Sequence, residues 1–314
     1  MNPNRVIHIG FPKTGTTTHQ NHLFSKHSQI AYLGKPYQSD RFKTEMHNLI
    51  MQESTIYQSA TLKEYMDKDL LNDNEGLEGN RVLVVSDEIM VSAFKVRDKG
   101  VVAQRIKEVF FPCKILITIR NQLEILKSTY ISGGRVLNNV PGKYRGRFVG
   151  FEEWLEFSYE NLYRSYMGNF IYFNTINYYV QLFGKSHVLV LLFEEFIHNK
   201  EEYIKKLADF LDIDGQESLE LVKTAHDNER IKQSQLDFEH LVASYLPMGR
   251  NHFISAAAKV YHLFHKILAK GKNEKAKIGI PTHWVERLSE IYCKSNRKLL
   301  ENYHLPLENY GYPL

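Results

Sequence analysis

The segment from Gly10 to Thr18, with the sequence G-F-P-K-T-G-T-T-T, constrains the fold of this chain more than any other. It follows an apolar run, Arg5 to Ile9, and leads into a helical pattern from about Thr16 to Lys26. A glycine-containing loop between a strand and a helix is an anion site, because free backbone N–H groups and the helix dipole converge there. Gly15 can adopt the backbone conformation that a tight loop needs. The sequence therefore predicts a phosphate-binding loop after the first strand.

Short apolar runs alternate with helical patterns along the chain, as in a parallel sheet with crossover helices. The runs are continuous in Val, Ile and Leu, which is typical of strands covered on both faces. Further strands are expected at Arg81–Val85, Lys114–Ile119 and His187–Phe193. Helices are expected near Gln122–Tyr130, Phe151–Tyr163, Ile171–Phe183, Glu201–Leu211 and His283–Tyr303. The predicted fold class is a three-layer α/β domain with a central parallel sheet and P-loop-like topology.

A single domain spanning residues 1–314 is expected, because no convincing linker divides the chain. Its length and its 43% hydrophobic content are ample for one large core. The stretch Gly133–Gly150 holds five glycines and the basic residues Arg135, Lys143, Arg145 and Arg147. We expect it to be a mobile loop over the acceptor pocket. The C-terminal third is expected to be helical.

The charge balance is mildly basic, with 40 Lys and Arg against 36 Asp and Glu. This excess does not indicate nucleic acid or a membrane as partner, and it suits a protein that holds one polyanion. Cys113 and Cys293 are far apart and lack metal-ligand spacing, so two reduced thiols and no metal are expected. The sequence shows neither a signal peptide nor a membrane span. We therefore expect a soluble, cytoplasmic protein, whose oligomeric state the sequence does not indicate.

The loop differs from the nucleotide P-loop, G-x-x-x-x-G-K-[ST], in the position of its lysine. Gly10 and Gly15 have the P-loop spacing. Thr17 occupies the position of the magnesium-binding hydroxyl, but Thr16 replaces the P-loop lysine. The lysine of this segment, Lys13, lies inside the loop, where it can touch a phosphate directly.

This segment resembles the 5'-phosphosulfate loop of sulfotransferases that use 3'-phosphoadenosine 5'-phosphosulfate (PAPS), P-K-[TS]-G-[TS]-[TS]. The resemblance implies that the loop binds the 5'-phosphosulfate of PAPS without magnesium, since PAPS has no β,γ-phosphate bridge. It also implies that Lys13 reaches the 5'-phosphate and the bridging oxygen. The six matching residues are Pro12, Lys13, Thr14, Gly15, Thr16 and Thr17.

The same family carries a 3'-phosphate motif, in which an arginine ends a strand and a serine follows eight residues later. Arg120 and Ser128 match this spacing after the run K-I-L-I-T-I, and an arginine fork holds a phosphate well. Farther on, Phe193 stands where many members carry tyrosine, which favours packing near adenine or a place in the core. The Arg-Lys-Gly triplet that closes the site in many members is not found in the sequence, and Arg230 and Arg250 are candidates for its role.

The family takes its general base from the end of a strand between the two cofactor motifs. Here that strand is followed by Ser86, Asp87 and Glu88. The resemblance implies that Glu88 is the base, with Asp87 in reserve, although Glu88 is also suited to a helix N-terminus. His19 and His22, three positions apart on a helix, compete for the role, but their spacing favours packing or solvent exposure.

The resemblance implies transfer of a sulfuryl group from PAPS to a hydroxyl or amine, leaving adenosine 3',5'-bisphosphate. Such transfer asks for in-line positioning and charge neutralisation, and Lys13 is expected to stabilise the leaving phosphate. The acceptor is expected to be a small molecule or a glycan. Two alternatives stay open: a P-loop kinase-like phosphotransferase using ATP and magnesium, and a non-catalytic nucleotide-binding module. Thr16 in place of the P-loop lysine counts against the first, and the carboxylate of Glu88 counts against the second.

Overall fold

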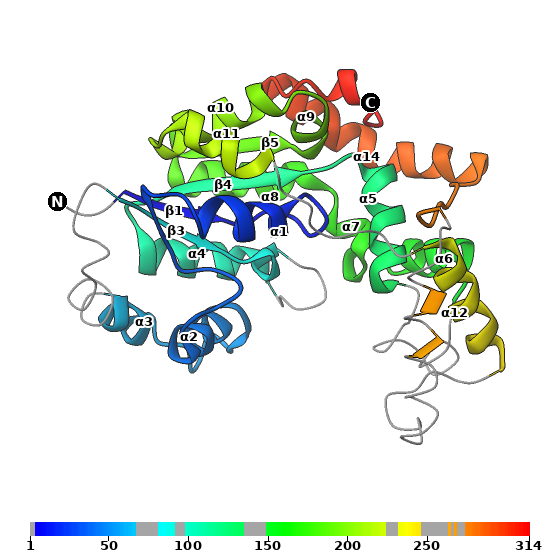
Figure 1. The fold of residues 1–314 in the computed structure, drawn as a ribbon, viewed down its shortest axis with the longest axis horizontal. Coiled ribbons are helices and arrows are strands. Elements are labelled where there is room, and N and C mark those ends of the chain that lie inside the picture. Colours follow the sequence, from blue (N-terminus) through cyan, green and yellow to red (C-terminus); the bar gives the residue numbers. More distant parts are fainter. Residues whose placement is uncertain are drawn as a thin grey trace.

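The computed structural model describes residues 4–66, 81–91, 98–134, 149–223, 232–245, 263–264, 267–268 and 274–314. Among these residues, five parallel strands form a sheet in the order β2-β3-β1-β4-β5 (Figure 1). The strands are β1 (Arg5–His8), β2 (Ile30–Tyr32), β3 (Val82–Ser86), β4 (Lys114–Ile119) and β5 (Val188–Leu192). The chain builds β2 and β3 on one side of β1 and then crosses to β4 and β5. In such a sheet the ligand crevice lies beyond the carboxyl ends of the strands, where the order reverses.

Helices cover both faces of this sheet. The α-helices are α1 (Thr16–Thr18), α2 (Asp40–Met51), α3 (Ser59–Tyr65), α4 (Lys99–Phe110), α5 (Gln122–Thr129), α6 (Phe151–Glu160), α7 (Tyr166–Asn169), α8 (Tyr172–Phe183), α9 (Phe193–His198), α10 (Lys200–Leu211), α11 (Gly215–Lys223), α12 (Gln233–Tyr245) and α14 (Thr282–Tyr303). Helices α10 and α11 lie on one side of the sheet and α4 on the other (Figure 1).

Alternate residues of the strands feed two separate hydrophobic clusters, as the period of two requires. Ile7, Val85 and Ile117 point to the larger cluster, which also holds buried side chains of α2, α4, α5, α8 and α14. Val6 and Leu116 point to the smaller cluster, which holds buried side chains of α10 and of the turn after α1. The predicted three-layer α/β fold with a central parallel sheet is therefore confirmed.

The strand predictions agree closely with the structure, and β4 matches Lys114–Ile119 at both ends. The predicted helix from Thr16 to Lys26 instead consists of α1 followed by a π-helical turn, His19–Phe24. The strand β2 and the helices α2, α3 and α4 were not predicted. The three residues of β2 are too few to show a period, and α2 to α4 join strands whose apolar runs were the stronger signal.

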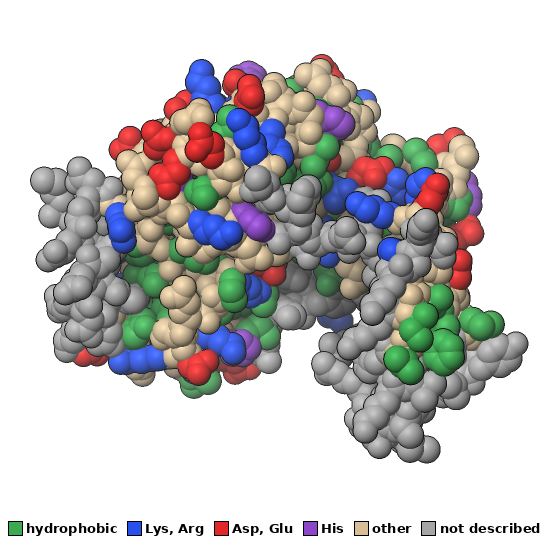
Figure 2. All heavy atoms as spheres, viewed as in Figure 1, with side chains coloured by type: hydrophobic (Ala, Val, Ile, Leu, Met, Phe, Trp, Pro, Cys, Tyr) green, Lys and Arg blue, Asp and Glu red, His purple; other side chains and the backbone are tan. Residues whose placement is uncertain are grey.

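The predicted mobile loop falls largely on residues 135–148, which lie outside the described part of the chain, as do Arg230 and Arg250. No helix within the described ranges is long and apolar enough to cross a membrane. Figure 2 shows apolar side chains gathered on the surface around α12, and the exposed residues there include Leu241, Leu263 and Phe264.

Candidate active site

The backbone of the loop after β1 turns through the left-handed region twice. Lys13 has φ 69° and Gly15 has φ 82°. For a lysine this conformation costs on the order of 1 kcal/mol, so the surrounding contacts must hold it in place. The N–H groups of Thr18 and His19 donate to the Gly15 carbonyl at 3.0 and 3.2 Å, which closes the first turn of α1. The N–H groups that precede these two in the first turn lack an acceptor within the helix and are available to an anion.

Arg120 and Phe193 lie directly against this loop. Arg120 follows β4, and its Nη1 donates to the Lys13 carbonyl at 3.1 Å. Its guanidinium carbon lies 4.7 Å from the centre of the Phe193 ring. A β-carbon added to Gly15 would lie 3.1 Å from the same ring, so only glycine lets Phe193 pack this closely. The structure therefore brings together Lys13, Gly15, Arg120 and Phe193, although the sequence placed Phe193 equally well in the core.

The other predicted loop residues divide into two groups. Thr14 and Thr16 are buried, whereas Pro12 and Thr17 are half-buried. Ser128 is half-buried in the last turn of α5, on the same strand–helix unit as Arg120.

A chain of buried hydrogen bonds supports the loop from beneath. The hydroxyls of Thr14 and Thr118 lie 2.6 Å apart, and the Thr118 hydroxyl lies 3.5 Å from Nε2 of His8. On its other side, Nδ1 of His8 lies 2.8 Å from the Ser86 hydroxyl, which also accepts from Gln20 at 2.9 Å. Burial lowers the pKa of His8 well below its usual range, so its ring is neutral. The loop is thus tied to the end of β3 through β1 and β4.

The site concentrates positive charge. Burial lowers the pKa of Lys13, the nearby guanidinium of Arg120 lowers it further, and the carboxylate of Glu88 opposes both. Two cations held side by side repel one another, and an anion between them would offset that repulsion. These residues therefore fit a ligand that carries phosphate groups.

Two carboxylates follow β3, and their surroundings differ. The side chain of Asp87 is 3% exposed; its Oδ2 accepts from the Tyr37 hydroxyl at 2.6 Å and its Oδ1 from the Ile89 N–H at 2.8 Å. The side chain of Glu88 is 28% exposed and accepts from Nε2 of Gln20 at 3.4 Å. Asp87 is therefore the buried carboxylate of the pair, and Glu88 is the more exposed one.

Lys35 also belongs to this cluster, although the sequence did not indicate it. Its Nζ lies 2.7 Å from Oδ1 of Asp87 and 3.2 Å from Oε1 of Glu88. It stands shortly after β2, in the segment L-G-K-P-Y. The pairing of β2 with β3 brings this segment to the end of β3, and the missed strand is the reason Lys35 was missed.

His19 is a packed side chain, as its helical spacing indicated. Its Nδ1 lies 2.9 Å from the Gly15 carbonyl and its Nε2 lies 3.0 Å from the Tyr203 hydroxyl. Burial lowers the pKa of His19 to about 4. With both ring nitrogens engaged, His19 is unsuited to take a proton from a substrate. His22 is half-buried on the same turn.

The C-terminal tail anchors the start of α5, a role that the sequence did not reveal. The side-chain amide of Asn121 donates to the carbonyls of Tyr310 and Gly311 at 3.0 and 2.7 Å. Glu194 accepts from the Asn121 N–H at 2.9 Å and from the Tyr312 hydroxyl at 2.9 Å. These contacts hold the turn that carries Arg120 against α9, which begins at Phe193.

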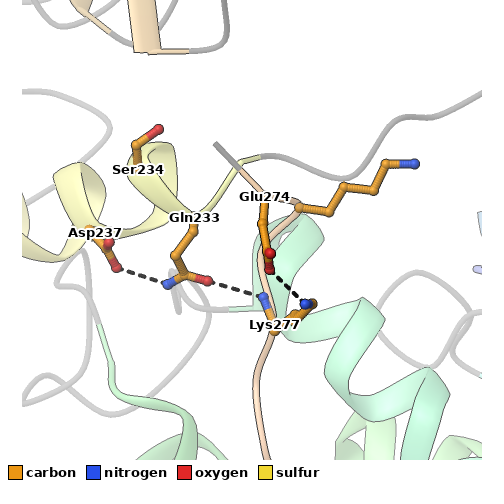
Figure 3. A pocket seen from close by; sticks show the side chains of 6 residues that line it. Gln233, Ser234, Asp237, Glu274 and Lys277 are labelled. Carbon is orange, nitrogen blue, oxygen red and sulfur yellow. Dashed lines mark hydrogen bonds and ion pairs between the residues drawn. The ribbon is translucent and has the colours of Figure 1, made fainter. Parts of the chain in front are cut away.

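A pocket of about 350 Å³ lies away from this site, between the start of α12 and the segment 274–277 (Figure 3). Gln233 lines it, donates to Asp237 at 2.9 Å and accepts from the Lys277 N–H at 3.0 Å. Its lining contains none of the predicted site residues. Among the described residues, no group of three or more His, Cys, Asp or Glu side chains is placed to hold a metal ion.

The profile of a family described as the sulfotransferase domain matches residues 3–259, most of the chain. The chain belongs to the sulfotransferase family. The match includes the loop after β1, the end of β3, the β4–α5 unit and Phe193. No curated protein matches the sequence significantly.

Solved sulfotransferase structures are also similar to this chain. The sulfotransferase from Alicyclobacillus acidocaldarius is 20% identical, over 83% of this chain and 96% of that one, with a TM-score of 0.46. The sulfotransferase domain from the curacin biosynthetic pathway is 11% identical, over 92% and 96%, with a TM-score of 0.45. Mouse sulfotransferase SULT7A1, complexed with PAP, is 12% identical, over 95% and 85%, with a TM-score of 0.41.

Proposed function

We propose that this protein transfers a sulfuryl group from PAPS to a hydroxyl or amine of a small-molecule or glycan acceptor. One observation carries the proposal: Arg120 of the second phosphate motif hydrogen-bonds the Lys13 carbonyl of the first, at 3.1 Å. Two motifs that each match a different phosphate of PAPS are therefore in contact, which supports a single site for both. A ligand with a single phosphate group would not need both motifs.

PAPS, when bound, supplies an activated sulfuryl group on its 5'-phosphate. The loop N–H groups and the Lys13 ammonium hold the 5'-phosphate, where Lys13 also stabilises negative charge that develops on the leaving oxygen. Arg120, with Ser128 beside it on α5, holds the 3'-phosphate. Phe193, packed on Arg120 at 4.7 Å, offers an apolar surface to the adenine. Arg230 and Arg250 stay candidates for a further 3'-phosphate contact.

Glu88 acts as the general base in this proposal. Its carboxylate is close enough to Lys13 to raise the Lys13 pKa against the effect of burial, which supports this role. It accepts the proton of the acceptor hydroxyl or amine as that group attacks sulfur. Asp87 is less suited to this role, because its oxygens already accept from Tyr37 and Ile89.

The function is tested by incubating the protein with radiolabelled PAPS and a panel of phenols, alcohols, amines and oligosaccharides, without metal. We expect adenosine 3',5'-bisphosphate and a labelled sulfated product in equal amounts. Parallel incubation with ATP and magnesium should give no phosphorylated product. Phosphorylation in that second incubation, with no sulfation in the first, would refute the proposal in favour of a kinase-like phosphotransferase.

A further inference from the structure

Lys35 is fixed next to the end of β3 by its own backbone. Its N–H donates to the Ser86 carbonyl at 3.1 Å, and its carbonyl accepts a hydrogen bond from the Tyr32 hydroxyl. The preceding residue, Gly34, permits this approach, because a β-carbon there would lie 2.6 Å from the Ser86 carbonyl oxygen. The Lys35 side chain therefore starts from a defined position beside the two carboxylates.

The two carboxylates hold Lys35 unequally. Asp87 is the closer at 2.7 Å and is nearly buried at 3% exposure, whereas Glu88 lies at 3.2 Å with 28% exposure. Asp87 is itself held by Tyr37, whose hydroxyl donates to it at 2.6 Å. Asp87 thus acts as a rigid anchor for the Lys35 ammonium, and the ammonium in turn presents a fixed charge to the more exposed Glu88.

Glu88 is held from two sides. Lys35 contacts its Oε1, and Gln20 donates to its Oε2 at 3.4 Å. Gln20 is itself bound to the buried Ser86 hydroxyl at 2.9 Å, so it cannot rotate freely. This arrangement limits the directions in which the Glu88 carboxylate can point.

Within the described part of the chain, the charged and titratable groups around Glu88 come from three segments. The loop after β1 contributes Lys13, and the end of β3 contributes Asp87. The segment around β2 contributes Lys35 together with the tyrosines Tyr32 and Tyr37. Burial raises the pKa of both tyrosines, so they stay neutral, and among the described residues Lys35 is the cation in direct contact with Glu88.

We propose that Lys35 is a positioning residue for sulfuryl transfer: held by Asp87, its ammonium keeps the Glu88 carboxylate directed at the acceptor. The inference rests on the proposed function, in which Glu88 is the base. The Lys35 ammonium at 3.2 Å from Oε1 and the Gln20 amide at 3.4 Å from Oε2 together fix the direction of this carboxylate. Lys35 acts through Glu88, so its loss should affect turnover and leave donor binding intact.

The test compares Lys35→Met, Lys35→Gln and Lys35→Arg with the wild type. PAPS consumption with water or the acceptor found in the panel gives kcat and the acceptor KM at neutral pH, and calorimetry with adenosine 3',5'-bisphosphate measures the donor site. In Lys35→Met and Lys35→Gln we expect kcat to fall roughly tenfold, with a smaller change in the acceptor KM. Bisphosphate affinity should stay within about threefold of the wild type, and Lys35→Arg should keep most of the activity.

Lys206→Met is the matched control, because Lys206 also forms a lysine–glutamate pair, with Glu195 at 2.9 Å, outside the site. It should leave kcat and the acceptor KM unchanged. If the neutral Lys35 variants lose thermal stability but keep the wild-type kcat, Lys35 is only structural and the inference is overturned. A wild-type protein that binds no bisphosphate would instead refute the proposed function.

Discussion

The guanidinium carbon of Arg120 lies 4.7 Å from the centre of the Phe193 ring, and that ring also covers Gly15 of the phosphate loop. Phe193 therefore contacts both halves of the proposed donor site, the β1–α1 loop and the β4–α5 turn. A cation over an aromatic ring contributes roughly 0.5 to 2 kcal/mol, more when water is excluded. The ring fixes the orientation of Arg120, the residue that we propose to hold the 3'-phosphate.

Replacing Phe193 with alanine should weaken the binding of adenosine 3',5'-bisphosphate about tenfold, because Arg120 loses the surface that orients it. Phe193→Tyr keeps the ring and should bind nearly as well as the wild type. The control is Phe173→Ala, which removes a ring with a similar cation, Lys298 at 5.1 Å, from elsewhere in the fold. Calorimetric titration of the three variants measures the effect. Equal losses in Phe193→Ala and Phe173→Ala would mean that the effect is general destabilisation.

Gly15→Ala should abolish bisphosphate binding. The residue has φ 82°, which a side chain tolerates poorly, and the added β-carbon would lie 3.1 Å from the Phe193 ring. Loop and ring must then move apart, which changes both phosphate sites. Gly279→Ala is the matched control, since an added β-carbon there would meet nothing within 4 Å. Thermal unfolding with and without bisphosphate distinguishes the two variants, and a normal ligand-induced shift in Gly15→Ala would contradict the assigned geometry.

The sequence predicted the parts of the site that lie on continuous motifs. Lys13, Gly15 and Arg120 were identified from a loop and a strand end, and the sheet brings them together because parallel strands deliver their carboxyl ends to one edge. The strand β4 was predicted at both ends, since four of its six residues are Ile or Leu.

The parts of the candidate site that the sequence did not predict depend on tertiary contacts. Lys35 follows a three-residue strand, and its partner carboxylates lie more than fifty positions away in the sequence. The anchoring of Asn121 by Tyr310 and Gly311 joins segments that share no periodic pattern. No local propensity reports such pairings, because they arise only when the strands have been placed side by side.

Folding stability should decrease as the pH falls through the range set by His19. Burial lowers the pKa of His19 to about 4 in the folded protein, against roughly 6.5 for an unfolded histidine. Between these values the unfolded chain takes up a proton that the folded protein refuses. The contribution of neutral His19 to the free energy of unfolding is therefore fully present above about pH 6.5. Roughly 2 kcal/mol of this contribution is lost by pH 5.

The measurement is urea unfolding of wild type and His19→Gln at pH 7 and pH 5. The variant lacks the titrating ring, so its stability should fall about 2 kcal/mol less than that of the wild type between these pH values. His187→Gln, at an exposed histidine, should behave as the wild type does. An equal decrease in wild type and His19→Gln would show that other groups control the acid sensitivity.

Glu88→Gln should lower kcat roughly 100-fold or more while bisphosphate affinity survives, because the amide keeps the shape of the side chain and removes its basicity. Asp87→Asn should reduce kcat much less, since Asp87 is an anchor with Tyr37 and Ile89 as partners. Steady-state kinetics on both variants, with bisphosphate binding as the folding control, decides between them. A near-normal kcat in Glu88→Gln, with an acceptor of low acidity, would remove Glu88 from the mechanism.

The central claim is that the loop holding Lys13 and the turn holding Arg120 form one site for a 3',5'-bisphosphorylated adenosine. The most direct measurement is the melting temperature of the wild type with adenosine 3',5'-bisphosphate in the presence of a chelator, compared with ATP and magnesium. The account predicts a stabilisation on the order of a few kcal/mol by the bisphosphate without metal, and a far smaller one by ATP and magnesium. An equal or larger stabilisation by ATP and magnesium would contradict it.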